Sequence, residues 1–258
     1  GIMKKIKIII LSILGILLVA VAVMGIWQRD NIVSFVNSLR YSETEITSKL
    51  EDNSKKLQKI VDSTEYIDIR GGLTEEEEKA LRNNEITADD AVKLIRGQTT
   101  LEQVKSGEAD NKTAETSAGA SEQTPNAGNN TANPDNNNTQ NPSKEDTMKD
   151  NVSDIVAQLY VAKSDFVNRL NGIGAQAYET YKANGSVKTS LTSIAESYAP
   201  AVGALETECD NKVNVLLSQL ETELKKGGGD LALVNQIRQY YYNEKSLTKS
   251  YYINKYMK

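Results

Sequence analysis

The sequence of 258 residues predicts an all-α protein. Its first apolar run, residues 8–27, is long enough for a transmembrane helix and holds no charge. Elsewhere apolar residues recur at intervals of three and four, the period of an amphipathic helix. No segment indicates a β-strand. We therefore expect an N-terminal transmembrane helix continuing into a short coiled coil, then a small helical segment, a disordered linker and an antiparallel three-helix bundle.

The run IIILSILGILLVAVAVMGIW at residues 8–27 has two interpretations, a cleaved signal peptide and a permanent anchor. A signal peptide has an apolar region of about 7 to 15 residues, followed by a cleavage site with small residues. Here the small-x-small triplet Ala20-Val21-Ala22 lies inside the apolar run. A twenty-residue helix spans about 30 Å, the thickness of a bilayer core. The sequence therefore predicts an uncleaved anchor.

The charges beside the run predict its orientation. Three lysines, Lys4, Lys5 and Lys7, precede it, whereas Arg29 after it is followed at once by Asp30. Because basic residues stay on the cytoplasmic side, we expect a short cytoplasmic tail at residues 1–7 and a single-pass protein of the cell membrane. The C-terminal domain would then be extracytoplasmic. The lipid bilayer is a predicted partner through residues 8–27.

Residues 28–66 predict a membrane-proximal coiled-coil helix. Positions at alternating spacings of three and four form an a/d row, and most of them are apolar. Asn53 in this row would fix the register of a parallel pair. The alternative is an amphipathic helix that packs against another part of the same chain. The candidate oligomer seam consists of Val36, Leu39, Ile46, Leu50, Asn53, Leu57 and Ile60.

Residues 67–104 contain a Gly71-Gly72 break, and the residues after it predict several short helices. Each start has a threonine followed three residues later by an acidic residue, the pattern of a capping box. The acidic residues suggest calcium, but no calcium-binding loop motif is present. The predicted starts are Thr74 with Glu77, Thr87 with Asp90, and Thr99 with Glu102.

Residues 105–147 contain no Ile, Leu, Val, Met, Phe, Tyr or Trp. Such a segment cannot bury a core, so we expect a disordered linker rich in Asn, Thr and Ser. It would act as a tether between a membrane-proximal module and a distal one.

Residues 148–258 predict a helical bundle of three long helices with short connections, which favour antiparallel neighbours. Pro200 should kink or split the second helix, and Gly227-Gly228-Gly229 should end it. Cys209 falls on the apolar stripe of that helix and is expected to pack in the core. The stripe of the second helix comprises Val202, Leu205, Cys209, Val213, Leu216, Leu220 and Leu224.

The composition excludes several classes of function. The chain has no histidine and one cysteine, so Ser-His-Asp triads, Cys-His dyads and His-based metal sites cannot form. The net charge is -5, and basic residues are dispersed among acidic ones, which argues against nucleic acid as a partner. We expect no enzyme, and we assign no catalytic, cofactor-binding or metal-binding residue.

Tyrosines near the C-terminus are the candidate partner interface. Six of the twelve tyrosines lie between residues 240 and 256. Three consecutive residues spread over about 200° of a helix, so some of the six must be exposed. The alternative is that the exposed rings are merely solvated. The candidate residues are Tyr242, Tyr252 and Tyr256.

These features predict a scaffold or adaptor in a bacterial cell envelope. It would oligomerise near the bilayer and present its helical bundle for protein–protein interaction. An alternative is an ectodomain that binds a cell-wall glycan or a small ligand through its tyrosines. A second alternative is a sensory ectodomain, which would have to signal through a partner because the predicted cytoplasmic tail is short.

Overall fold

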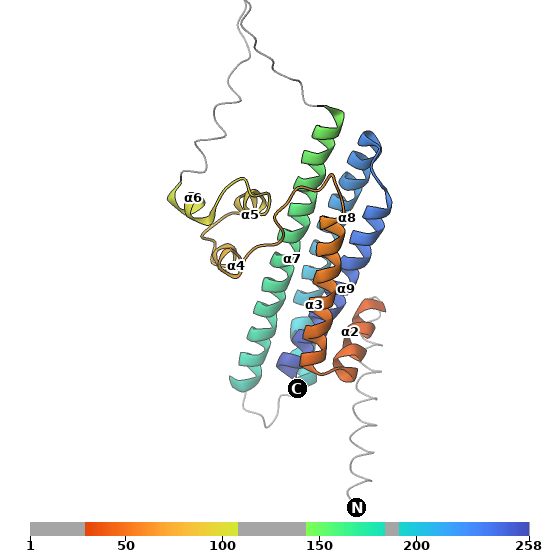
Figure 1. The fold of residues 1–258 in the computed structure, drawn as a ribbon. Helices are drawn as coiled ribbons and strands as arrows, with labels where there is room; N and C mark the ends of the chain where they lie inside the picture. Colours follow the sequence, from red (N-terminus) through yellow and green to blue (C-terminus); the bar gives the residue numbers. More distant parts are fainter. Residues whose placement is uncertain (1–28, 108–142, 184–190, 258) are drawn as a thin grey trace, which may run out of the picture. The chain divides into compact units, whose positions relative to one another are not determined.

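The computed structural model describes residues 29–107, 143–183 and 191–257. Within these ranges the chain forms helices joined by turns and loops, with no strand (Figure 1). The predicted all-α class is therefore confirmed. The chain divides into two compact units. Among the described residues, unit 1 comprises 29–63, 162–183, 191–218 and 231–257, and unit 2 comprises 64–107, 143–161 and 219–230.

Two predicted segments fall mainly outside this description. The predicted anchor, residues 8–27, lies outside it entirely, and so does most of the predicted linker, residues 108–142. Across the part of the chain that the structure describes, no helix combines the length and apolar character needed to cross a bilayer.

Unit 1 begins with two helices where the sequence predicted one. Helix α2 (Arg29–Arg40) and helix α3 (Glu43–Asp62) are separated by Tyr41 and Ser42. Ser42 is the N-cap of α3: its hydroxyl accepts a hydrogen bond from the Glu45 N–H, and its own N–H donates to the Glu45 carboxylate at 2.7 Å. The continuous helix expected over residues 28–66 was wrong, because this capping box starts a new helix inside the a/d row.

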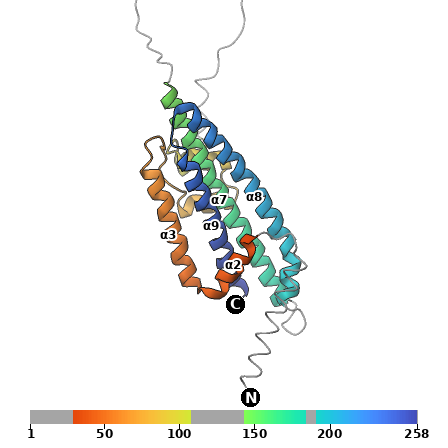
Figure 2. The same ribbon diagram turned by 90° about the vertical axis from the view of Figure 1, so that its right-hand side faces the viewer.

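Helices α2 and α3 lie along helix α9 (Ala232–Met257) in both views (Figures 1 and 2). Helix α3 buries Ile46, Asn53 and Leu57 within the chain. This packing corresponds to the intrachain alternative for residues 28–66. Helix α9 is therefore the element on which both N-terminal helices of unit 1 are assembled.

Helices α7 (Lys144–Ala183) and α8 (Leu191–Gly227) contribute residues to both units. Pro200 was predicted to kink or split α8, and the split is wrong, because Pro200 lies inside a continuous helix with buried residues on both sides, at Ile194 and Leu205. Proline removes one backbone hydrogen bond, and the packing beyond it keeps the helix intact. The apolar stripe of α8 is confirmed as buried at Leu205, Cys209, Val213, Leu216, Leu220 and Leu224.

Unit 2 contains three short helices, α4 (Glu75–Arg82), α5 (Ala88–Ile95) and α6 (Leu101–Ser106). The capping boxes predicted for the first two are confirmed, with Thr74 and Thr87 as N-caps. The third starts one residue later than predicted, because Thr100 with Gln103 caps it instead of Thr99 with Glu102. A glutamine side chain can accept the N-cap N–H as a glutamate does, so both registers fit the pattern.

The short helices of unit 2 pack on the first part of α7. Ala91 and Ile95 of α5 form a buried cluster with Ala157 and Val161 of α7. Arg96, whose side chain is almost fully buried, forms ion pairs with two carboxylates of α7, Asp150 at 2.8 Å and Asp154 at 3.1 Å.

The compact units do not follow the predicted domains. Helix α6 and the start of α7, which flank residues 108–142, both belong to unit 2. Unit 1 likewise combines α2 and α3 with α9. Each unit is thus built from both sides of the predicted linker.

Candidate interaction site on helix α9

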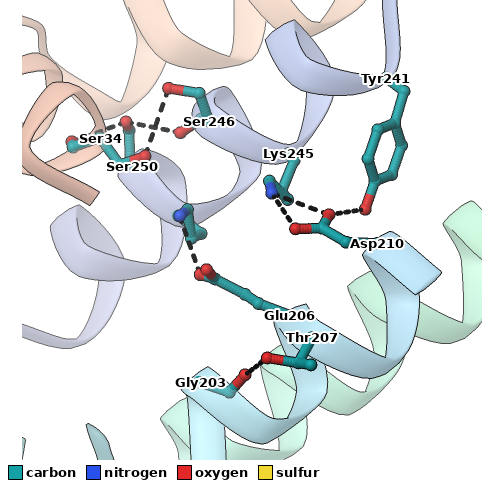
Figure 3. Close-up of polar contacts among 10 residues, drawn as sticks. Ser34, Gly203, Glu206, Thr207, Asp210, Tyr241, Lys245, Ser246 and Ser250 are labelled. Carbon is teal, nitrogen blue, oxygen red and sulfur yellow. Dashed lines mark hydrogen bonds and ion pairs between the residues drawn. The ribbon is translucent and has the colours of Figure 1, made fainter. Parts of the chain in front are cut away.

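Two lysines of α9 are buried and paired with carboxylates of α8. Lys245 Nζ lies 2.9 Å from both oxygens of Asp210, and the hydroxyl of Tyr241 donates to the same carboxylate at 2.6 Å (Figure 3). One turn later, Lys249 Nζ lies 2.8 Å from Glu206 Oε1. Only 1% and 5% of the two lysine side chains are exposed. A buried side chain can stay charged when an opposite charge pairs with it in this way.

A second ionic group links α9 to α3 and α7. Lys163 Nζ lies 2.8 Å from Glu244 Oε1 and donates to the Tyr240 hydroxyl at 2.9 Å. The side-chain amide of Asn53 donates to Glu244 Oε2 at 2.8 Å and to the Tyr240 carbonyl at 3.3 Å. Asn53, expected to fix the register of two chains, thus has intrachain partners that fix α3 against α9.

The pKa values of this group reflect burial and charge. Burial raises the pKa of Tyr240 to about 12, with the nearby Glu244 adding to the shift and Lys163 opposing it. Burial alone would lower the pKa of Lys163, but Tyr240 and Glu244 outweigh it and raise that pKa above its ordinary value. Both groups therefore keep their protons at neutral pH.

Helix α2 is attached to α9 by hydroxyl and amide groups. The Ser250 hydroxyl donates to the Ser34 carbonyl at 2.7 Å, and the Ser34 hydroxyl donates to the Ser246 hydroxyl at 3.2 Å (Figure 3). At the end of the contact, the Asn254 amide donates to the Tyr41 carbonyl at 3.0 Å. The described contacts of α9 with α2 and with Tyr41 thus include three hydrogen bonds of serine and asparagine side chains.

These groups do not form a recognisable catalytic arrangement. Burial raises the pKa of the Cys209 thiol, which keeps it protonated and weakly nucleophilic. Its burial confirms the predicted core position. In the described ranges, no group of three or more His, Cys, Asp or Glu residues is placed to hold a metal ion. The ionic groups on α9 join helices, and that is the role their geometry supports.

The end of α9 carries a cluster of aromatic rings, which we call the tyrosine cluster and define as Tyr178, Tyr251, Tyr252 and Tyr256. Tyr252 and Tyr256 are stacked, with ring centroids 6.1 Å apart and planes 10° from parallel. Tyr251 meets Tyr252 edge to face at 5.1 Å, and Tyr178 of α7 lies 6.1 Å from Tyr256. The Lys255 ammonium lies 5.1 Å from the Tyr256 centroid, within the range of a cation–π interaction.

Two residues of α7 fix the position of Tyr256. The Tyr256 hydroxyl donates to the side-chain oxygen of Asn171 at 2.7 Å. Its ring lies so close to Gly174 that a Cβ atom there would come within 2.6 Å of the ring. The absence of a side chain at Gly174 therefore makes room for the ring.

The structure brings together two of the three predicted interface tyrosines. Tyr252 and Tyr256 stack on each other, whereas Tyr242 lies about 15 Å earlier along the helix at 1.5 Å per residue. Tyr242 is exposed and packs beside Tyr241 instead. Sequence reasoning missed Tyr178, because its contribution depends on the pairing of α7 with α9, which no local pattern encodes.

The predicted oligomer seam is divided by the structure. Val36 and Leu39 of α2 are exposed, Leu50 and Ile60 of α3 are half-buried, and the rest of the row is buried within the chain. The buried members are Ile46, Asn53 and Leu57.

Comparison of the chain with protein-family models, curated proteins and solved structures found no match. Function must therefore be inferred from the sequence and from the arrangement of these side chains.

Proposed function

We propose that this protein is a membrane-anchored scaffold or adaptor whose helical bundle binds a protein partner outside the cytoplasm. The observation that carries the proposal is the tyrosine cluster. Tyrosine rings offer a large contact area at low entropic cost, and aromatic residues dominate the energetics of protein interfaces. The anchor and the orientation rest on the apolar run of residues 8–27 and the lysines before it.

The cluster is pre-organised for binding. Ring stacking and the contacts of Tyr256 with Asn171 and Gly174 hold the rings before any partner arrives. A surface that is already ordered loses less conformational entropy on binding.

The polar interior of unit 1 supports a scaffold role in a second way. Buried ion pairs add little net stability compared with apolar residues, but they penalise wrong registers of packing. The pairs of Lys163, Lys245 and Lys249 each join α9 to another helix. We infer that they hold the helices in one arrangement, as a platform for a partner requires.

Self-association through the predicted seam is not part of this proposal. Its central residues, Ile46, Asn53 and Leu57, are buried within the chain.

Site-specific photocrosslinking in native membranes tests the proposal. A photoreactive phenylalanine derivative replaces Tyr252 in the full chain, and in a matched control it replaces Val215, which is exposed on α8. We expect one defined protein adduct from position 252 that the control does not give. Tyr256→Ala should weaken the adduct more than Tyr242→Ala, because only Tyr256 belongs to the cluster. Equal labelling at positions 252 and 215, or no protein adduct at 252, would refute a protein partner at this surface.

A further inference from the structure

Among the side chains of helix α2 that the structure describes, two serines are buried and two apolar residues are exposed. Ser34 and Ser38 are buried, with 1% and 0% of their surface exposed, whereas 49% of Val36 and 56% of Leu39 are exposed. At 100° per residue, the two serines share one side of the helix, and Val36 and Leu39 share the opposite side.

The inward side of α2 is held by hydroxyl groups. Ser34 exchanges hydrogen bonds with Ser246 and Ser250 of α9, and Asn254 reaches the backbone of Tyr41 just after the helix. Small residues that hydrogen-bond across a close helix pair are typical of helices packed inside a membrane, where lipid removes the advantage of apolar contacts.

The exposed residues Val36 and Leu39 of α2 would be more stable in an apolar environment than in water. In water, a helix packed on a larger body normally buries its apolar residues and exposes its polar ones. The reverse arrangement is favourable when the outer surface meets something apolar. Val36 and Leu39 occupy adjacent places on that surface, one helical turn apart.

The position of α2 in the chain indicates what that apolar environment is. The predicted membrane span ends at Trp27, and the described part of α2 starts at Arg29, so α2 follows the predicted span closely in the chain. Arg40 ends the helix, and a basic residue suits the headgroup region of a bilayer. We propose that α2 lies on the lipid surface, with Val36 and Leu39 at the boundary between headgroups and acyl chains. This inference rests on the membrane anchor of the proposed function.

A second copy of the chain is less well supported than lipid as the group that covers Val36 and Leu39. A coiled coil of two chains needs several heptads of exposed a and d residues. Here the buried positions of Ile46, Asn53 and Leu57 leave only Val36 and Leu39 strongly exposed in the predicted seam.

Quenching of tryptophan fluorescence by brominated lipid tests the inference, because Trp27 is the sole tryptophan of the sequence. Three forms of the full chain are placed in phosphatidylcholine–phosphatidylglycerol nanodiscs. These are the wild type, the double variant Trp27→Phe with Leu39→Trp, and the double variant Trp27→Phe with Val215→Trp. Leu39 and Val215 are both 56% exposed in unit 1, so they are matched probes. Val36→Trp on the same background is a second probe of α2.

We expect the wild type and the Leu39→Trp variant to lose emission in brominated lipid, and the Val215→Trp variant to keep it. The Leu39→Trp variant should also show blue-shifted emission. Equal quenching of the Leu39→Trp and Val215→Trp variants would overturn the inference. So would a blue shift without quenching, which would indicate a protein surface or a second copy over α2. If only the wild type is quenched, the anchor stands and the lipid contact of α2 fails. If none of the three is quenched, the anchor fails as well.

Discussion

Lys245 carries the most completely buried charge among the described residues, and the Asp210 carboxylate compensates for the burial of its ammonium group. Lys245→Met keeps most of the side-chain volume but removes the ammonium group, so the Asp210 carboxylate keeps the Tyr241 hydroxyl as a donor but loses its paired charge. Removing one member of a buried pair strands the other charge, so we expect a loss of about 3 kcal/mol in unfolding free energy. The control Lys225→Met breaks an exposed pair with Glu221 and should cost under about 1 kcal/mol.

Urea unfolding followed by circular dichroism measures both variants. Equal losses in the two variants would contradict a structural role for the buried pair.

Glu77 should make the stability of the chain depend on pH. Burial would raise the pKa of Glu77, but hydrogen bonds from Arg70 and from the Thr74 N–H outweigh it and hold the pKa below its usual value of 4.5. The unfolded chain therefore takes up this proton first as the pH falls. The stabilisation is present above about pH 4.5 and is lost as the pH drops through the lower folded value.

Glu77→Gln should accordingly lower the unfolding free energy by about 2 kcal/mol at neutral pH, the range for a hydrogen-bonded charge. The difference from wild type should shrink on acidification below pH 4.5. Urea titrations at a series of pH values measure this, and the exposed neighbour Glu76→Gln is the control. If the difference in unfolding free energy between the Glu77→Gln variant and the wild type did not change with pH, the charge of Glu77 would not contribute to stability and its role would be purely steric.

Individual exposed residues were easier to predict than their groupings. The counting argument for the C-terminal tyrosines required some rings to be exposed, and Tyr242 is. The stacking of Tyr252 on Tyr256 also follows from their spacing of one turn on α9. The meeting of Tyr256 with Tyr178 does not, because it depends on how two distant helices pair.

At the scale of helices, the contact of α7 with α9 gives a test with an internal control. Gly172 and Gly174 lie in the same helix, but only a Cβ at Gly174 would strike the Tyr256 ring. Gly172→Ala should therefore raise the unfolding free energy by about 0.5 to 1 kcal/mol through reduced backbone entropy. Gly174→Ala should instead lower it by about 1 to 3 kcal/mol through overpacking.

Thermal unfolding ranks the two glycine variants against wild type. The Gly174→Ala variant should also lose the photocrosslink described for position 252, since displacing Tyr256 disrupts the stack. If both variants gained stability equally, the ring would have an alternative position at little cost.

The start of a helix could be predicted where its capping box did not overlap with another sequence pattern. Thr74 follows the Gly71-Gly72 break, and Thr87 precedes the apolar residues of α5; both are N-caps. Ser42 with Glu45 carries the same signature, yet the apolar spacing of the a/d row continues through it, so the break was missed. Two patterns that each fit the same residues cannot be separated without knowing that α2 and α3 both pack on α9.

At the scale of the whole chain, each unit combines residues from both sides of the segment 108–142. We therefore expect that a protease site inserted in this segment can be cut without separating the two fragments. Asn53 with Glu244 and Ser34 with Ser250 would still join them. Size-exclusion chromatography in detergent should show the fragments eluting together, and in denaturant they should elute apart.

The same arrangement predicts that residues 148–258 expressed alone will fold poorly. That fragment lacks the partners that α2 and α3 give to α9, and it would expose Glu244 and Ser250. Adding residues 29–107 should restore cooperative unfolding. A stable, cooperatively folded fragment of residues 148–258 would instead support the domain boundaries predicted from the sequence. Those boundaries were placed at the linker, because a segment without apolar residues gives no sign that helices on its two sides pack together.

The pairing of α2 and α3 with α9 also constrains synthesis on the ribosome. Helix α3 emerges early, but the helix that covers Ile46 and Leu57 is made about 180 residues later, roughly 10 to 40 s at about 5 to 20 residues per second. During that interval the apolar side of α3 is uncovered, at a point in the chain just beyond the predicted membrane span. The nascent chain should therefore need a holding factor until α9 arrives. A chain that terminates early, before α9, would leave that surface permanently open to aggregation and proteolysis.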